Sequence, residues 1–376
     1  MGKQYPQIRK SCQFEYLRPV NRQHFIKNGP FLALVVFCTL AGCKKDQQSQ
    51  APKLVDMSIE GQTAKKAMDA AFTFRFLIGD DVDITKVQTH FKLNAGNKAL
   101  LNNTEVTDGS VIDFSEARTL TVVAGERSAN YTIDVQKEWS YFGLTGTVTA
   151  SKSLNKDYNF YFDQFDGSAL QAINCGPTVT TMAIKWVDKS YTGTPAQART
   201  DVPANNDWWY TNNITKYLGD HGVSNSTVMI TDFDSLVKTN IDKGRLIILC
   251  LDMYLFVNYN STDYQHTEKF YQTLAKDWGH FLLVKGYKVT TTGLYLEIYD
   301  PYSQNRLYAD EFSLQVFGQQ QSKGKDRYYS SSTIVQSCMK WWPYVILVAP
   351  QGQTATTAVT GGRLVHPSQI PAARGR

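Results

Sequence analysis

Cys175 stands in the stretch INCGPTVTTMAIKW, directly before Gly176 and Pro177. Pro177 suits the first turn of a helix, where its missing N–H is not needed. Apolar residues then recur at helical spacing and predict one buried stripe, formed by Val179, Met182, Ala183, Trp186 and Val187. Unpaired N–H groups and the helix dipole at the start of such a helix would lower the pKa of the thiol and make it a nucleophile. A cysteine that is only buried and packed fits this stretch equally well.

A thiol nucleophile needs a base, and the sequence contains six histidines. Three of them lie outside the region around Cys175, namely His24, His90 and His366. Of the other three, His221 precedes Gly222, where a histidine often caps the end of a helix. His266 lies in a polar insertion, whereas His280 opens a predicted strand. We therefore expect His280 to be the base.

A carboxylate follows His280 at a distance that suits a hairpin. Residues 280–289 and 294–300 are predicted as two strands that turn near residues 291–293, which places His280 and Asp300 at the open end. A carboxylate there can accept the Nδ1–H of the imidazole, fix its tautomer and stabilise its charged form. Asp300 precedes a proline, so a simple turn residue is the alternative.

The three motifs NCGPTVTTMAIKW, GHFLLVKGY and YLEIYDPYS occur in this order between residues 158 and 348. Together they resemble the papain-like cysteine peptidases of the bacteriocin-processing, double-glycine leader peptidase type and their secreted relatives. The resemblance implies that Cys175 is the nucleophile, His280 the base and Asp300 the orienting acid. No transporter segment follows, so coupled leader cleavage and export is not implied.

The same family uses a glutamine shortly before the cysteine as an oxyanion donor. Gln171 is only four residues upstream of Cys175, too close to fold back across it. Gln164 ends the apolar, strand-like stretch 158–165, as the glutamine of the family does, although the loop after it is longer than usual. The resemblance therefore favours Gln164 over Gln171.

Charge is concentrated at the N-terminus. The chain contains 39 basic and 34 acidic residues, and residues 1–42 hold six of the basic ones and one acidic one. The remainder carries 33 of each, so the mature protein has no electrostatic reason to bind nucleic acid. The apolar run 31–41 has the length of a secretory signal and is too short to span a bilayer.

The sequence Leu40-Ala41-Gly42-Cys43 that ends this run resembles the lipobox of bacterial lipoproteins. We expect residues 1–42 to be a lipoprotein signal peptide and Cys43 to carry the lipid, with a plain signal peptide or a short anchor as the alternative. Residues 43–52 then form a flexible tether. The protein would be exported and lipid-anchored to the bacterial membrane, facing the periplasm or on the cell surface.

Three cysteines remain after these segments, and their odd number argues against a disulfide framework. Cys250 ends the apolar run RLIILC, and Cys338 lies in VQSCMKWW. Both are predicted to be buried and inert, with a bridge between them left open.

The fold class predicted is multidomain. Residues 53–137 show period-two alternation, with Phe72, Phe74 and Phe76 on one face, and predict an all-β sandwich. Residues 113–135 resemble the closing strands of immunoglobulin-like modules. Residues 138–350 predict an α+β, papain-like peptidase domain, with helices at 207–222 and 233–244, and residues 351–376 a disordered tail.

The leading prediction is a cysteine peptidase that cleaves peptide bonds through a thioester, without a cofactor or metal ion. Its expected partners are a peptide or protein substrate and the membrane lipid. Two alternatives stay open: a thiol amidase or acyl transferase on cell-wall or isopeptide substrates, and a catalytically inactive surface-binding lipoprotein.

Overall fold

The computed structural model describes residues 51–66, 68–203, 208–256, 266–271, 276–308 and 322–355. The predicted signal peptide, Cys43 and most of the tether and tail lie outside the described residues. Within the described part, none of the helices is both long and apolar enough to cross a membrane.

The first part of the described chain consists of two β-sheets. A three-stranded sheet has the order β1 (Leu54–Ile59), β4 (Val87–Leu93), β7 (Val111–Ile112). A six-stranded sheet has the order β2 (Gln62–Lys66), β3 (Thr73–Ile78), β9 (Arg127–Lys137), β8 (Arg118–Ala124), β5 (Lys98–Leu101), β6 (Thr104–Val106). Residues of both sheets share one apolar core, so this part is an all-β, two-sheet structure as predicted.

Alternation along the strands is confirmed in β9, where Tyr131, Ile133 and Val135 are buried. It is wrong for Phe72, which is 52% exposed and does not share a face with Phe74 and Phe76. The reason is a turn anchored by Asp69, whose carboxylate accepts the N–H groups at residues 71 and 73. This turn gives Phe72 a positive φ of 57° and delays the strand to residue 73.

The second part is built on an antiparallel seven-stranded sheet. Its order is β11 (Asn225–Met229), β16 (Tyr344–Val348), β12 (Leu246–Asp252), β13 (Gly279–Thr290), β14 (Gly293–Tyr299), β15 (Arg327–Ser330), with β10 (Val148–Ser153) also on β13. The long β13 pairs with β12 along its first half and with β10 along its second half. The predicted hairpin of residues 280–289 and 294–300 is present as β13 and β14.

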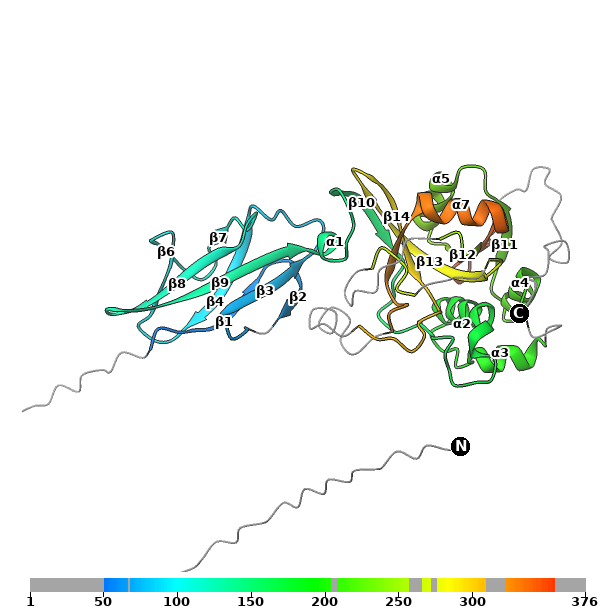
Figure 1. Cartoon of the computed structure of the whole chain (residues 1–376), viewed down its shortest axis with the longest axis horizontal. Coiled ribbons are helices and arrows are strands. Elements are labelled where there is room, and N and C mark those ends of the chain that lie inside the picture. Colours follow the sequence, from blue (N-terminus) through cyan, green and yellow to red (C-terminus); the bar gives the residue numbers. More distant parts are fainter. Residues whose placement is uncertain are drawn as a thin grey trace, which may run out of the picture. The chain divides into compact units, whose positions relative to one another are not determined.

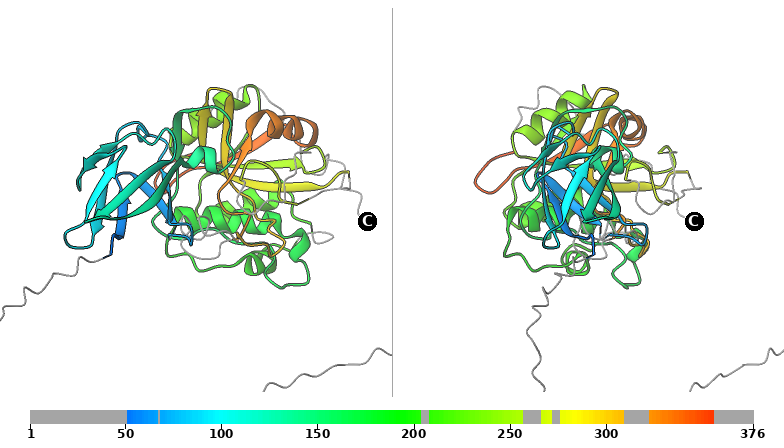
Figure 2. Two further views of the ribbon diagram at one scale, coloured as in Figure 1. Left: turned by 60° about the vertical axis from the view of Figure 1, so that its left-hand side comes forward. Right: turned by 90° about the vertical axis from the view of Figure 1, so that its left-hand side faces the viewer.

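Helices cover both faces of this sheet (Figure 1). One face carries α2 (Cys175–Val187), α3 (Pro195–Asp201) and α4 (Thr211–Asp220), and the other carries α5 (Phe233–Asp242) and α7 (Ser331–Trp341). Figure 2 (left) shows the green α2 and the orange α7 on opposite sides of the yellow β13. A short helix, α1 (Glu138–Tyr141), and a 3-10 turn, η1 (Gln171–Ile173), complete the described elements.

The continuous apolar sequence of β12 follows from this layering. Leu246, Ile248 and Cys250 pack in the core on the α2 side, whereas the residues between them pack on the α5 and α7 side. Because both faces are covered, every residue of β12 is buried. The prediction of a core strand from the run RLIILC is confirmed.

Several local expectations are wrong. Residues 158–165 form no strand, and the Tyr158 hydroxyl instead donates to the carbonyl of Trp186 near the end of α2. The helix expected at 207–222 begins only at Thr211. Residues 351–355, assigned to the tail, pack on the fold, since the Ala355 N–H and carbonyl bond to Ser224 and Ser226. The prediction that Cys250 and Cys338 are buried is confirmed; both are free thiols, so the bridge left open between them is not formed.

A buried charge cluster lies within the sheet. Lys285 in β13 is fully buried and forms ion pairs with Glu297 and, at 2.8 Å, with Asp326. Burial alone would lower the pKa of Lys285, but the two carboxylates raise it above its ordinary value. Asn155 adds a hydrogen bond to Glu297. The cluster joins β13, β14 and the residue before β15 through charges that must remain paired.

Lys285→Met should therefore lower the free energy of unfolding by about 3–5 kcal/mol, because it leaves two buried carboxylates without a cation. Lys216→Met is the matched control, since Lys216 pairs with Asp220 on the exposed side of α4. That variant should change stability by less than about 0.5 kcal/mol. Chemical denaturation measures both; equal effects would contradict the assigned role of the cluster.

Candidate active site

Cys175 is the first residue of α2, as the sequence predicts. The loop before it is braced by Arg199 of α3, which donates to the Asn174 side chain and to the Ile173 carbonyl, both at 2.6 Å. No side chain caps the helix. The thiol is buried, which alone would raise its pKa, and the backbone N–H groups of Phe281 and Gly176 are among the groups that lower it. The start of α2 thus offers donors to a thiolate rather than to a capping oxygen.

His280 lies near the start of β13, and its ring and the Cys175 thiol are close enough for each to shift the pKa of the other. Its ring is buried, and its Nε2 is 2.9 Å from Oδ1 of Asp300. The three side chains that the sequence singled out are therefore joined in the order Cys175, His280, Asp300. The ring of Tyr302 stands edge-on to the imidazole, with centroids 5.9 Å apart.

The contact between His280 and Asp300 differs from the expectation in one respect. Asp300 bonds to Nε2, whereas the sequence analysis assigned the carboxylate to Nδ1–H. Because Asp300 occupies Nε2, Nδ1 is the nitrogen left to the thiol. The imidazole extends from the start of β13 and has partners on two different elements, Cys175 in α2 and Asp300 at the end of β14. The positions of these two elements determine which ring nitrogen faces which partner.

Asp300 is fully buried and accepts four hydrogen bonds through its carboxylate. Oδ1 accepts from His280 and from the N–H of Tyr302, both at 2.9 Å. Oδ2 accepts from the phenols of Tyr271 and Tyr329, both at 3.0 Å. These four donors satisfy the buried carboxylate and hold it in position beside His280. Sequence reasoning missed both tyrosines, because neither lies in a motif.

The backbone of Asp300 is held by a close approach that only glycine allows. The Asp300 N–H donates to the carbonyl of Gly324 at 2.8 Å, and a Cβ on Gly324 would lie 1.8 Å from the Asp300 carbonyl oxygen. That oxygen also accepts from the phenol of Tyr161 at 3.1 Å. Gly324 was not singled out either; its only sequence signal is a glycine between two lysines.

The electrostatics favour a charged pair. Burial alone would raise the pKa of Cys175, but the hydrogen bond and charge of His280 lower it below its ordinary value. Burial alone would likewise lower the pKa of His280, but Asp300 and Cys175 raise it to about 9. At neutral pH the thiolate and imidazolium are therefore stabilised together.

The other histidines have local roles. His221 is the C-cap of α4, and its Nδ1 is 2.9 Å from the carbonyl of Tyr217. His266 is buried and stacked on Tyr308 at 4.5 Å, and burial holds its pKa well below the ordinary value. His90 is half-exposed beside Asp108 in the two-sheet part. None of these three has a hydrogen bond to Cys175 among the described residues.

Gln164 is buried between the loop that precedes Cys175 and the segment that follows Asp300. Its backbone N–H donates to the carbonyl of Pro301, next to Asp300, and its side-chain Nε2 donates to the carbonyl of Gln171 at 2.9 Å. The Gln171 side chain turns back into its own loop and accepts from the N–H of Gly167. Of the two glutamines, Gln164 therefore lies between the segments that carry Cys175 and Asp300.

Comparisons with known proteins match this chain to solved structures at low sequence identity. No protein-family model and no curated protein matches the chain. Among solved structures, the peptidase domain of Streptococcus ComA, a bi-functional ABC transporter, is 16% identical, covering 50% of this chain and 97% of its own, with a TM-score of 0.31. A C39-like peptidase from Bacillus anthracis is 11% identical, covering 54% and 100%, with a TM-score of 0.33.

UfSP from C. elegans is 12% identical, covering 55% of this chain and 35% of its own, with a TM-score of 0.34. Similarity at these levels carries no conclusion about the chemistry of this chain. That conclusion rests on the geometry of its own residues.

The charged pair predicts the pH dependence of thiol alkylation. The rate at which iodoacetamide modifies Cys175 should rise at a pH below the ordinary pKa of a thiol, because His280 stays protonated up to about pH 9. Asp300→Asn removes the charge that raises the pKa of His280, so the imidazole becomes neutral and the alkylation midpoint moves to higher pH.

Asp242→Asn is a matched control, since that carboxylate in α5 accepts from Tyr287. Mass spectrometry of the modified peptides separates Cys175 from Cys250 and Cys338. A wild-type midpoint at the value of an ordinary thiol, or a midpoint that Asp300→Asn leaves unchanged, would contradict the pairing.

Proposed function

We propose that residues 138–350 form a papain-like cysteine peptidase domain that hydrolyses peptide bonds. The observation that carries this proposal is the arrangement of three side chains: Cys175 opens α2, the His280 ring interacts with its thiol, and His280 Nε2 is 2.9 Å from Oδ1 of Asp300. A thiol with a lowered pKa, a base in contact with it and a carboxylate that orients the base are the parts that nucleophilic acyl transfer requires.

In the first step the Cys175 thiolate attacks the carbonyl carbon of the scissile bond. The carbonyl oxygen becomes an oxyanion, and the imidazolium of His280 gives its proton to the leaving amine as the C–N bond breaks. A thioester between the acyl group and Cys175 remains. In the second step neutral His280 takes a proton from water, the resulting hydroxide attacks the thioester, and the thiolate leaves.

Asp300 stabilises the imidazolium and keeps the ring in place through both steps. Its two phenol donors and the N–H of Tyr302 fix the carboxylate. The proposed oxyanion donor is Gln164. One hydrogen of its amide nitrogen is donated to the Gln171 carbonyl, which leaves a second hydrogen for the developing negative charge.

The same proposal places the enzyme at a membrane. Cys43 follows small residues at the end of an apolar run, and acyl chains on that cysteine would anchor the chain by burying methylenes at about 0.8 kcal/mol each. The tether and an immunoglobulin-like sandwich of residues 53–137 would then hold the peptidase domain away from the lipid, in the periplasm or at the cell surface.

Cys175→Ala and His280→Ala should each lower the turnover of a peptide library by about 10⁴-fold or more without unfolding the protein. His221→Ala and Cys338→Ala are the matched controls and should retain most activity, because these residues cap α4 and fill the core. Liquid chromatography of the digest gives the rates. If only isopeptide or side-chain amide bonds are cleaved, the enzyme is an amidase and not a peptidase. If Cys175→Ala retains activity, the proposal is wrong.

In the same assay, Gln164→Ala should reduce turnover by about 10²-fold, whereas Gln171→Ala should have little effect. The pair is matched because both changes remove one amide side chain from the loop before Cys175. A larger loss in Gln171→Ala would show that the oxyanion donor is wrongly assigned.

Cys43→Ser should abolish partition of the expressed protein into detergent, since it removes the acylated thiol. The mature wild-type protein should begin at Cys43. Detergent partition by the variant, or a mature chain that retains residues 1–42, would refute the assignment of the protein as a lipoprotein.

A further inference from the structure

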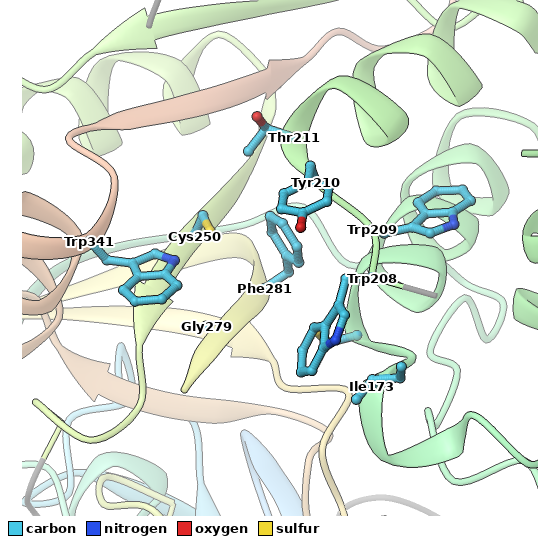
Figure 3. Close-up of a pocket in the computed structure, with 10 residues that line it drawn as sticks. Ile173, Trp208, Trp209, Tyr210, Thr211, Cys250, Gly279, Phe281 and Trp341 are labelled. Carbon is cyan, nitrogen blue, oxygen red and sulfur yellow. The ribbon is translucent and has the colours of Figure 1, made fainter. Parts of the chain in front are cut away.

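A turn of the two-sheet part exposes apolar side chains to solvent. We call its residues 68–72, which have the sequence MDAAF and lie between β2 and β3, the apolar tip. Met68 and Phe72 are 37% and 52% exposed. Trp341 and the other residues drawn in Figure 3 line a pocket beside Cys175 and belong to the active site. The apolar tip is a separate surface, between two strands of the six-stranded sheet.

The one charged side chain of the apolar tip, Asp69, is turned to the backbone and to Arg75. Its Oδ1 accepts the N–H groups of Ala71 and Thr73 at 2.9 and 3.0 Å. Its Oδ2 accepts a hydrogen bond from Arg75 at 2.7 Å. The Arg75 guanidinium and these N–H groups hold the pKa of Asp69 below its ordinary value. The charge is therefore paired within the turn, and the exposed side chains that remain in the tip are apolar: Met68, Ala70, Ala71 and Phe72.

Phe72 is exposed in a backbone conformation that bulky residues rarely adopt. Its φ of 57° lies in the left-handed region, which glycine, asparagine and aspartate tolerate best. The edge of its ring meets Tyr131 with the centroids 5.7 Å apart. A strained turn thus holds an aromatic ring at the surface, although asparagine would form the same turn with less strain.

The apolar tip lies at the end of the two-sheet part where the described chain begins. After β1, the Gly61 carbonyl accepts from the N–H of Gly79, which directly follows β3. Because β1 and β3 finish together, they also start at a common end, and the tip directly precedes β3. The chain before β1 is held at this end, since the Asn94 side chain donates to the carbonyl of Ala51.

The distance along the chain from Cys43 to this end is short. Seven residues, 44–50, separate Cys43 from Ala51. Fully extended, the chain between these two residues spans at most about 28 Å. A lipid on Cys43 would therefore keep the apolar tip near the membrane surface. Even a weak apolar contact is then sufficient, because the anchor makes binding intramolecular and the effective concentration of lipid high.

We propose that the apolar tip inserts into the membrane surface, with Phe72 and Met68 entering the boundary between headgroups and acyl chains. The inference rests on the lipoprotein part of the proposed function, because the anchor brings the tip to the lipid. Apolar and aromatic side chains favour this boundary, and insertion removes from water the surface that the fold leaves exposed. The contact would fix one end of the two-sheet part at the membrane.

A fluorophore beside Phe72 measures the contact. Ala71→Cys is labelled with a nitrobenzoxadiazole probe in a Cys175→Ala background, so that the reactive thiol takes no label, and the purified full chain is combined with phosphatidylcholine vesicles. The emission at residue 71 should shift to shorter wavelength, and doxyl-labelled phosphatidylcholine should quench it.

Ser115→Cys is the matched control and should show neither change. Ser115 is exposed and follows β7, whose Ile112 pairs with Val87 at the start of β4. Since β4 is antiparallel to β1, this position lies at the opposite end of the two-sheet part.

Phe72→Asn should lower the ratio of inserted to free tip by about tenfold, because it removes the largest apolar group and leaves a residue that suits the turn. Met68→Ser is a second variant and should lower the same ratio. Val111→Asn should leave it unchanged, since Val111 is 64% exposed but lies at the end that carries Ser115.

Mass spectrometry of the N-terminal peptide shows whether Cys43 carries lipid, which separates this inference from the lipoprotein proposal. Lipid on Cys43 without quenching at residue 71 would refute the contact alone. Quenching at residue 71 in a chain without lipid would support the contact and refute the lipoprotein, and no quenching in such a chain would refute both. Equal quenching at residues 71 and 115, or quenching that Phe72→Asn and Met68→Ser leave unchanged, would also overturn the inference.

Discussion

The hydrogen bond between His280 and Asp300 depends on the register of one hairpin. Leu283 lies opposite Tyr299 in β13 and β14, so continuation of the ladder would place Asp300 opposite Leu282. His280 lies two residues before Leu282 in β13, so its side chain points to the same face of the sheet as that of Leu282. The two polar side chains are therefore diagonal neighbours. A slip of one residue would turn Asp300 to the opposite face and separate it from the imidazole.

This register is protected by features that lie outside Cys175, His280 and Asp300. The buried Lys285 is in β13 and pairs with Glu297 in β14 and with Asp326 just before β15. An out-of-register sheet would leave these charges buried without partners, which is a large cost. At the end of β14, the backbone of Gly324 lies close against the carbonyl of Asp300 and fixes the backbone there. Charge pairing and backbone contact thus hold the hairpin in the one alignment that brings the site together.

The sequence predicts the parts of the site that depend on local pattern. The helix at Cys175 follows from apolar spacing and Pro177, and the hairpin follows from two apolar runs around a short turn. Tyr271 and Tyr329 could not be found in this way, because their phenols reach Asp300 from segments 29 residues away in either direction along the chain.

The same limit explains the errors. Which nitrogen of His280 meets Asp300 depends on where α2 lies relative to the end of β14, and no periodicity encodes that placement. The stretch 158–165 is apolar enough to predict a strand, yet Tyr158 and Tyr161 use their hydroxyls to bond carbonyls on α2 and at Asp300. Contacts with distant segments such as these override local strand propensity.

The claim that Cys175 becomes covalently attached to the acyl part of the substrate is tested most directly by trapping that intermediate. Acid quenching during turnover, followed by intact-mass and peptide mass spectrometry, should find the acyl group on Cys175 in a bond that hydroxylamine cleaves, as it does a thioester. If product forms while no adduct is found on Cys175, or if the adduct maps to another residue, the assignment of Cys175 as the nucleophile is wrong.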